Sequence, residues 1–395
     1  MMAATRLALL VAFAALLSAR GAGAKVYIEW RPRMSLMAGY NDNVLLNGTG
    51  ADGFGQAVPG IKLDIFGEHN LHVAVDCQAG LARLAHPEQF GLSSGFATNE
   101  TCNLETRLHL SPRDKLHFRG GATYSQDPFS IGLGLLLRPG QSDIFVAHVG
   151  GEVEHALTGH SEIDYGMEGQ ALAFGSGDPG NGFVLAPNLR YAWKTSARSK
   201  WDLGVREQLF FGIGAPRGSA RAPNGAPGGL LDEGHSLLLG YSYALSPWTN
   251  LTVRGGGVLL TGLNQAAMPT ARVQLESYTP GLALSIMVAH DLVIGPSSAG
   301  PLIGDFAELG VVRDWEHVAA HLRVGVYRNA GVSHALDIGT LGYGTEVGLG
   351  WKFTRDLRIE VAALRDARLN DVTVAQQVDR NVLQLRLIWE KARFE

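Results

Sequence analysis

Apolar and polar residues alternate along most of the chain with a period of two. The alternation is clearest in four segments, 71–77, 104–110, 237–245 and 383–389, where leucine, valine, tyrosine or tryptophan, and once each cysteine and threonine, occupies every second position. Successive side chains of an extended strand point to opposite faces. One face of each segment is therefore apolar and the other is polar, charged or small. The pattern predicts β-strands with two different environments and does not predict helices.

Short turn sequences rich in Pro, Asp, Ser and Gly separate alternate pairs of these strands. They occupy 111–114, 157–160, 196–199, 246–249, 313–316 and 354–356. Longer segments rich in Gly, Pro and Asn lie between the other pairs, and the longest runs from Gly214 to Gly234. Tight turns at one end and long loops at the other are typical of outer-membrane β-barrels.

The fold class predicted from this pattern is an all-β, antiparallel, up-and-down transmembrane barrel of about 18 strands, with 16 as an alternative. An even strand number places both chain termini on the side of the short turns, which is the periplasmic side in such barrels. The predicted strands are 26–45, 57–67, 70–83, 100–111, 115–125, 143–156, 160–173, 183–194, 201–213, 235–245, 251–262, 270–278, 282–294, 303–313, 317–328, 340–353, 357–368 and 378–390.

Residues 1–24 have the pattern of a signal peptide. Arg6 supplies the positive charge, the apolar stretch 7–17 has 11 residues, and Ala22-Gly23-Ala24 fits the cleavage site. A membrane-spanning helix needs about 20 apolar residues. We therefore expect a mature chain of one barrel domain, 25–395, in the outer membrane of a Gram-negative cell.

Composition and charge exclude several other classes. Mean hydropathy is +0.05, and after Lys25 no apolar stretch approaches 20 residues, which argues against transmembrane helices. Without the signal peptide, which contains two of the 33 basic residues and no acidic one, 31 basic residues face 37 acidic ones. This balance gives no support for nucleic-acid binding. A propeller would show a blade repeat, and none is visible.

A sheet in hydrocarbon must close, because its edge strands would otherwise leave backbone groups without partners. Eighteen strands give a barrel about 35 Å across, which is too wide for side chains to fill. We therefore expect a water-filled lumen, narrowed by loops that fold inward. The segment 214–234 is the main candidate for such a loop.

The polar parity of each strand identifies the side chains that should line the lumen. These candidates are Asp76, Glu105, Arg107, His109, Arg119, Glu162, Asp164, Glu168, Arg190, Arg206, Arg254, Arg272, Glu276, Arg323 and Arg386. Their mixed signs suit a neutral or weakly charged polar permeant better than one strongly selected ion. Aromatic residues fall mostly on the other parity, as in the girdle that meets the membrane interface.

Cys77 and Cys102 occupy consecutive strands, at similar distances from the loop between them and both on the apolar parity. A cross-strand pair would allow a disulfide, whereas a register shift of two residues would separate the two thiols. Two cysteines alone do not form a zinc site.

No segment has the features of an active site. Gly91-Leu92-Ser93-Ser94-Gly95 matches the nucleophile-elbow pattern in letters, but no helix follows it. His155, His235 and His290 have no matching serine. We expect no enzyme activity, no cofactor and no bound metal.

Two short segments carry a family resemblance. Residues 39–46 (GYNDNVLL), followed by Val58-Pro59-Gly60-Ile61, resemble the opening of the exopolysaccharide-associated "barrel porin 2" family of outer-membrane barrels. The resemblance implies a conduit that exports an exopolysaccharide polymer with a periplasmic export protein. The tail after Trp389 departs from the usual aromatic C-terminus that the barrel assembly machinery reads.

Two other functions remain open from the residues alone. One is a general diffusion porin for small polar solutes, and the other is a surface structural or adhesion barrel. Outer-membrane lipid is a partner in each case.

Overall fold

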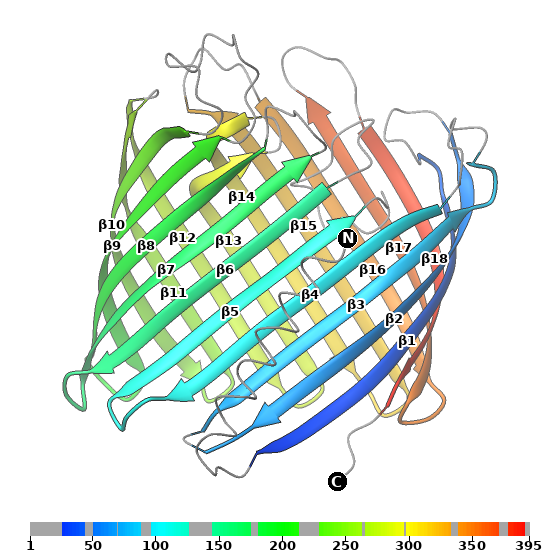
Figure 1. Ribbon diagram of the computed structural model, residues 1–395, viewed down its shortest axis with the longest axis horizontal. Helices are drawn as coiled ribbons and strands as arrows, with labels where there is room; N and C mark the ends of the chain where they lie inside the picture. Colours follow the sequence, from blue (N-terminus) through cyan, green and yellow to red (C-terminus); the bar gives the residue numbers. More distant parts are fainter. Residues whose placement is uncertain are drawn as a thin grey trace.

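The computed structural model describes residues 26–43, 50–68, 70–87, 96–125, 144–174, 181–212, 229–262, 265–295, 298–332, 339–370 and 378–391. These residues form eighteen antiparallel strands in a single sheet (Figure 1). The strands are β1 (Tyr27–Asn41), β2 (Asp52–Phe66), β3 (His72–Leu84), β4 (Phe96–His109), β5 (Asp114–Ser125), β6 (Ile144–Ala156), β7 (Ser161–Phe174), β8 (Gly182–Lys194), β9 (Ser199–Gly212), β10 (Gly229–Ser246), β11 (Thr249–Gly262), β12 (Ala266–Thr279), β13 (Leu282–Gly295), β14 (Ser298–Asp314), β15 (Val318–Gly331), β16 (Gly339–Lys352), β17 (Leu357–Asn370) and β18 (Val378–Glu390).

Each strand pairs with its neighbours in the sequence, and β1 pairs with β18 from Arg33↔Glu390 to Asn41↔Val382. The sheet is therefore closed, and it has no edge strand to leave backbone groups without partners. The predicted all-β, up-and-down barrel of about 18 strands is confirmed.

Several strands begin earlier than the sequence predicts. β2 begins at Asp52, β10 at Gly229 and β14 at Ser298, where the pattern predicted 57, 235 and 303. These extensions contain Gly, Pro and Ser, which have low strand propensity. Pairing with a neighbouring strand outweighs that propensity, because each added residue finds a partner for its backbone groups.

The seam between β1 and β18 is held by polar contacts of Asp42 and Asn43. Asp42 accepts hydrogen bonds from the backbone and side-chain amides of Asn381 at 2.7 and 2.6 Å, and the Asn43 side chain donates to the Asp379 carbonyl at 2.7 Å. A Cβ atom on Gly39 would lie 2.5 Å from the Leu383 carbonyl oxygen. The described part of the 39–46 motif thus fastens the last strand to the first.

The two ends of the barrel differ in their connections. At the short-turn end, at the bottom of Figure 1, connections have two to five residues. In one of these turns Gly281 has a φ of +76°, and a Cβ there would lie 2.8 Å from the Asp314 carbonyl oxygen, so only glycine fits without strain. At the opposite end, here called the long-loop end, the connection between β5 and β6 spans 126–143.

All seven tryptophans lie at or beside the short-turn end. They are Trp30, Trp193, Trp201, Trp248, Trp315, Trp351 and Trp389. Tryptophan favours the boundary between hydrocarbon and water, because its ring is apolar and its N–H is polar. The ring of tryptophans therefore marks one membrane interface.

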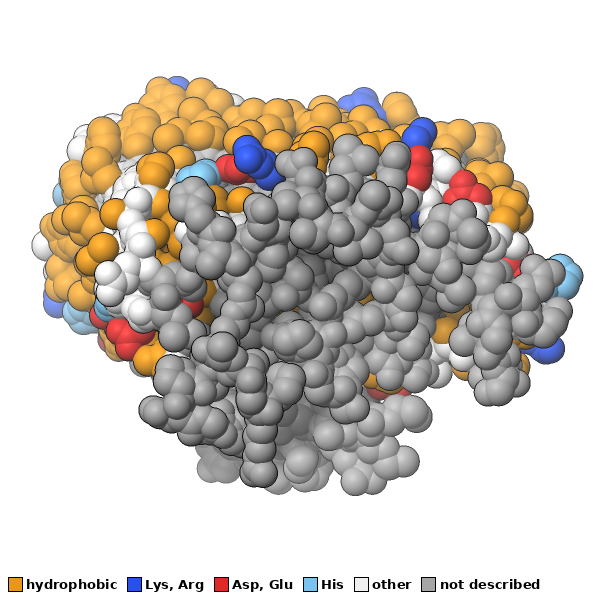
Figure 2. All heavy atoms as spheres, turned by 90° about the horizontal axis from the view of Figure 1, so that it is seen from above, with side chains coloured by type: hydrophobic (Ala, Val, Ile, Leu, Met, Phe, Trp, Pro, Cys, Tyr) orange, Lys and Arg blue, Asp and Glu red, His pale blue; other side chains and the backbone are white. Residues whose placement is uncertain are grey.

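Apolar side chains cover the outer wall. Leu203, Leu237, Leu349 and Leu383 are 46–59% exposed, and Figure 2 shows such residues around the rim of the barrel. Among the described residues, no helix has the length and hydropathy needed to cross a bilayer. An apolar outer surface of this extent is suited to contact with lipid.

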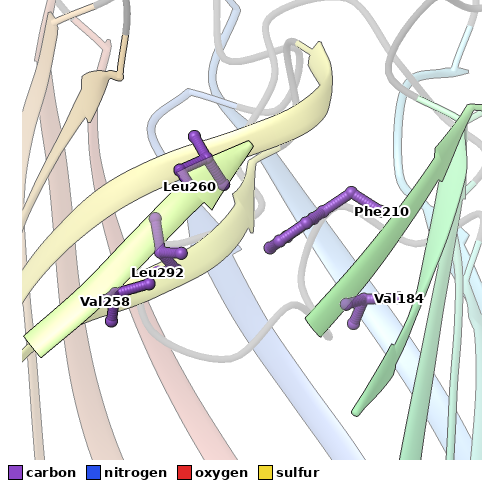
Figure 3. Close-up of a cluster of buried hydrophobic side chains, with 5 residues drawn as sticks. All are labelled: Val184, Phe210, Val258, Leu260 and Leu292. Carbon is purple, nitrogen blue, oxygen red and sulfur yellow. The ribbon is translucent and has the colours of Figure 1, made fainter. Parts of the chain in front are cut away.

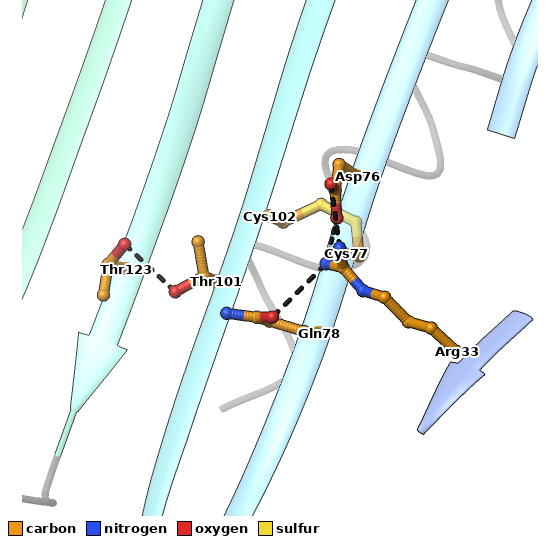
Figure 4. The surroundings of a disulfide bond; sticks show 7 residues. All are labelled: Arg33, Asp76, Cys77, Gln78, Thr101, Cys102 and Thr123. Carbon is orange, nitrogen blue, oxygen red and sulfur yellow. Dashed lines mark hydrogen bonds and ion pairs between the residues drawn. A yellow bond between two sulfur atoms is a disulfide. The ribbon is translucent and has the colours of Figure 1, made fainter. Parts of the chain in front are cut away.

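Cys77 and Cys102 face one another directly in the register of β3 and β4, with their Cα atoms 4.0 Å apart and their sulfur atoms bonded (Figure 4). Both side chains lie on the apolar outer parity. On the inner parity of the same wall, Arg33 pairs with Asp76 and donates to the Gln78 side chain at 3.3 Å. The two faces of one strand thus carry different chemistry.

Candidate functional site

The lumen contains a cavity of about 820 Å³ along the wall from β2 to β12. Nine of the fifteen predicted lumen residues line it: Asp76, Glu105, Arg107, Arg119, Glu168, Arg190, Arg206, Arg254 and Arg272. Lys62, His148, Glu152 and Asp202 line it as well and were not predicted. The alternation of each strand brings these side chains to the inner face, because every second residue points inward.

The wall of this cavity carries more positive than negative groups. Seven Lys or Arg side chains and five Asp or Glu side chains line it, although the whole chain has a formal net charge of −4. The excess is concentrated on the segment from β8 to β12, which contributes four arginines and one aspartate. An anion in the cavity therefore meets a favourable field on this side.

Most of these charges are partly compensated within the wall. Arg190 Nε donates to Asp164 Oδ2 at 2.8 Å, and an Arg190 terminal nitrogen lies 3.3 Å from Glu152 Oε1. Arg119 pairs with Glu168, and Arg206 lies 3.8 Å from the same carboxylate. These partly exposed pairs fix the arginines in place more than they stabilise the fold.

Arg254 and Arg272 form a weakly compensated part of the wall. They face one another in the register of β11 and β12. Arg254 lies 3.1 Å from Asp202, and among the described residues no carboxylate lies within ion-pair distance of the exposed Arg272. Like charges on opposite residues of two strands repel, so an anion between them would be stabilised by both.

The other six predicted lumen residues lie on inward parity away from this cavity. Their partners are Asn70 for His109, Lys200 for Glu162, Arg190 for Asp164, Gln274 for Glu276, Glu308 for Arg323, and Glu346 and Glu360 for Arg386. The Gln274–Glu276 contact lies within β12, whereas the other contacts connect different strands or turns on the water-facing side of the sheet.

A cluster of apolar side chains narrows the lumen near the long-loop end. It consists of Val184, Phe210, Val258, Leu260 and Leu292, each at most 8% exposed (Figure 3). The first four lie on the inward parity of β8, β9 and β11, where polar residues would be expected. Leu292 belongs to the β13–β14 hairpin, and the contacts of β14 with β8, β9 and β10 bring that hairpin across the lumen.

The sequence predicted an inward-folded loop at 214–234. Of the predicted 214–234 loop, residues 214–228 lie outside the described part of the chain, and 229–234 belong to β10. The described residues place the β13–β14 hairpin in the lumen, which the sequence did not predict. The sequence signal for this was present: apolar runs at 209–211 and 258–260 replace the alternation of the rest of those strands.

The side chains that resemble a serine–histidine–aspartate catalytic set do not have the contacts that catalysis requires. Ser93 lies outside the described residues. At the short-turn end, the Ser111 hydroxyl donates to Asp114, and His155 Nδ1 lies 2.6 Å from the same carboxylate. A serine nucleophile needs the histidine as its base, and here the carboxylate stands between the two. Within the described ranges, no group of three or more His, Cys, Asp or Glu side chains could hold a metal.

Comparison with known proteins gives distant structural matches only. No family model and no curated protein matches the chain. OccK2 (OpdF) of Pseudomonas aeruginosa is 10% identical over 92% of this chain and 98% of its own, with a TM-score of 0.45. OccAB4 of Acinetobacter baumannii is 8% identical over 92% and 98%, with a TM-score of 0.43. A BenF-like porin of Pseudomonas fluorescens is 8% identical over 93% and 99%, with a TM-score of 0.44.

These matches correct one expectation. The matched solved barrels include a BenF-like porin, and none of those named here is described as a polysaccharide exporter, so the expected exopolysaccharide conduit, with its polymer and its periplasmic export protein, is wrong. The motif behind that expectation has a structural explanation in its described part. Residues 39–43 fasten the seam of the barrel, which any closed barrel requires, and they do not face the cavity.

Proposed function

We propose that this protein is a passive diffusion channel of the outer membrane for small polar solutes, with a preference for anions. The observation that carries the proposal is the charged cavity of about 820 Å³ inside a closed barrel whose outer wall is apolar. A wall that is apolar outside and charged inside is suited to contact with lipid on its outer face and with water on its inner face.

The size and the charge of the cavity set the expected permeants. Its volume is within the range of pockets that hold small molecules, about 300–1,000 Å³. A solute of that size would exchange part of its hydration for contacts with the wall. Seven cationic groups against five anionic ones favour a small anion over a cation of the same size.

The remaining parts of the proposal concern location and assembly. Both described ends of the chain, the start of β1 and the end of β18, lie at the short-turn end. We expect this end to face the periplasm, because porin turns are short there. Insertion by the barrel assembly machinery follows from this location. Transport needs no catalytic group, so we expect no enzymatic activity.

Swelling of proteoliposomes tests the proposal. Vesicles that contain the purified protein should swell in isosmotic solutions of monosaccharides and of small organic anions, and the rate should fall steeply as the solute grows. Vesicles prepared with heat-unfolded protein are the control. If native protein gave no swelling above this control with any solute, the channel would be ruled out, and a structural barrel with a closed lumen would remain.

A further inference from the structure

The β13–β14 hairpin leaves the barrel wall at its tip. The ladder between β12 and β13 stops at Ala271↔His290, whereas the ladder between β13 and β14 continues from His290↔Asp305 to Ile294↔Pro301. Beyond His290 the hairpin is therefore paired with itself and no longer with β12. Because β14 lies four or more strands away from β8, β9 and β10 in the sheet, its contacts with them cross the lumen.

The tip rests on an apolar seat. Leu292 packs into the cluster formed with Val258 and Leu260, and the ring of Phe210 reaches toward this group from the facing strand (Figure 3). Gly234 of β10 provides room for it, since a Cβ atom there would lie 3.1 Å from Leu292 Cδ1. These contacts are not directional, so they hold the tip without fixing one position.

One charged contact connects the tip to the cavity. Asp291 Oδ2 lies 3.6 Å from Arg206, whose side chain lines the cavity. The other oxygen of Asp291 accepts from the Leu292 backbone amide at 2.9 Å and from Thr270 Oγ1 at 3.3 Å. Asp291 and Arg206 are 25% and 28% exposed, so solutes in the lumen can reach both.

We propose that Asp291 acts as a built-in competitor for permeant anions and determines which solutes pass. In the structure its carboxylate connects the hairpin tip to Arg206 on the cavity wall. A solute that carries a carboxylate or phosphate group takes its place on Arg206, the tip loses its only charged contact with β9 among the described residues, and the passage widens. This inference rests on the proposed channel function and assigns the specificity to a named pair.

The geometry favours exchange over a permanent bond. At 3.6 Å the pair is longer than a charge-assisted hydrogen bond of about 2.7–2.9 Å, and Arg206 is shared with Glu168 at 3.8 Å. A partly exposed pair of this kind is weak. A solute anion that contacts Arg206 at closer range than Asp291 does can therefore displace Asp291 at ordinary concentrations.

Single-channel recording in planar bilayers tests the inference. Asp291→Asn should at least double the mean open current and abolish the increase that added small carboxylates cause in the native channel. Asp305→Asn is the matched control: it removes the same charge from the same hairpin, but Asp305 pairs with His290 at 2.5 Å on the outward parity. This control should behave like the native channel.

A second pair of variants tests whether the hairpin itself moves. In a background with Cys77 and Cys102 replaced by serine, Gly234→Cys with Leu292→Cys should cross-link on addition of a short bifunctional thiol reagent. The cross-link should lower the current of the double variant by half or more relative to its current before the reagent, and the same reagent should not alter the current of either single-cysteine variant. If the native channel conducts, and both Asp291→Asn and the cross-linked channel conduct as it does, this inference is overturned and the proposed function is not. A silent native channel would overturn the proposed function as well.

Discussion

Arg380→Met is expected to lower the free energy of unfolding by about 3–5 kcal/mol, because it leaves a buried carboxylate without its counter-charge. Arg380 and Asp366 face one another on β18 and β17, are 0% and 1% exposed, and form an ion pair. Both side chains lie on the inner parity of their strands, near the long-loop end. The measurement is a urea titration of the protein in detergent, followed by the shift between the folded and unfolded bands on unheated gels.

The double variant separates the charge effect from the loss of packing. Arg380→Met combined with Asp366→Asn removes both charges and should recover a large part of the lost stability, because a neutral pair carries a much smaller desolvation penalty. If Arg380→Met had the same urea midpoint as the native protein, the buried pair would not contribute to stability as described.

Arg254→Glu together with Arg272→Glu should reverse the ion preference of the channel from anions to cations. The cavity wall would change from seven positive and five negative groups to five and seven. In a tenfold KCl gradient, the reversal potential should change sign. Arg254→Gln with Arg272→Gln, which leaves five groups of each sign, should bring it close to zero.

An arginine on the outer face provides the control for this charge reversal. Arg328 of β15 lies two residues after the exposed Val326 and therefore on the same outward parity. Arg328→Glu makes half of that change of charge on the lipid side and should leave the reversal potential unaltered. An equal effect of inner and outer variants would mean that surface charge, and not the cavity wall, sets the selectivity.

The period of two was sufficient to predict the strands and their closure. A sheet in hydrocarbon must close, because its edge strands would otherwise leave backbone groups without partners. Each predicted strand has its counterpart in the structure. Strand starts were the weaker part, because residues such as Gly229 and Ser298 have loop-like propensity but gain partners in the ladder. The residue types alone do not reveal that these backbone groups gain hydrogen-bond partners.

The parity that identified the candidates could also have found the residues that were missed. Lys62 lies between Ile61 and Leu63, and Asp202 lies between Trp201 and Leu203, so both obey the same alternation. Asp291 could not be found in this way. Its strand leaves the wall after His290, and from there on the alternation no longer separates lumen from lipid.

The function could not be deduced from the short motif at the start of the barrel. Residues 39–43 resemble a family of polysaccharide barrels, yet in the structure Asp42 and Asn43 bond across the β1–β18 seam. Closure is needed whatever passes through the lumen. The motif therefore describes how the wall is built, whereas the selectivity proposed here depends on side chains scattered over β2 to β12.

Chemical accessibility during current recording tests most directly whether the charged lumen is the path. In a background without the native cysteines, Asn188→Cys places a thiol on the cavity wall and Leu203→Cys places one on the lipid side. A charged, membrane-impermeant thiol reagent should reduce the current through the Asn188→Cys channel and leave the Leu203→Cys channel unaffected. A current that responded equally in both, or in neither, would contradict a water-filled lumen as the route of transport.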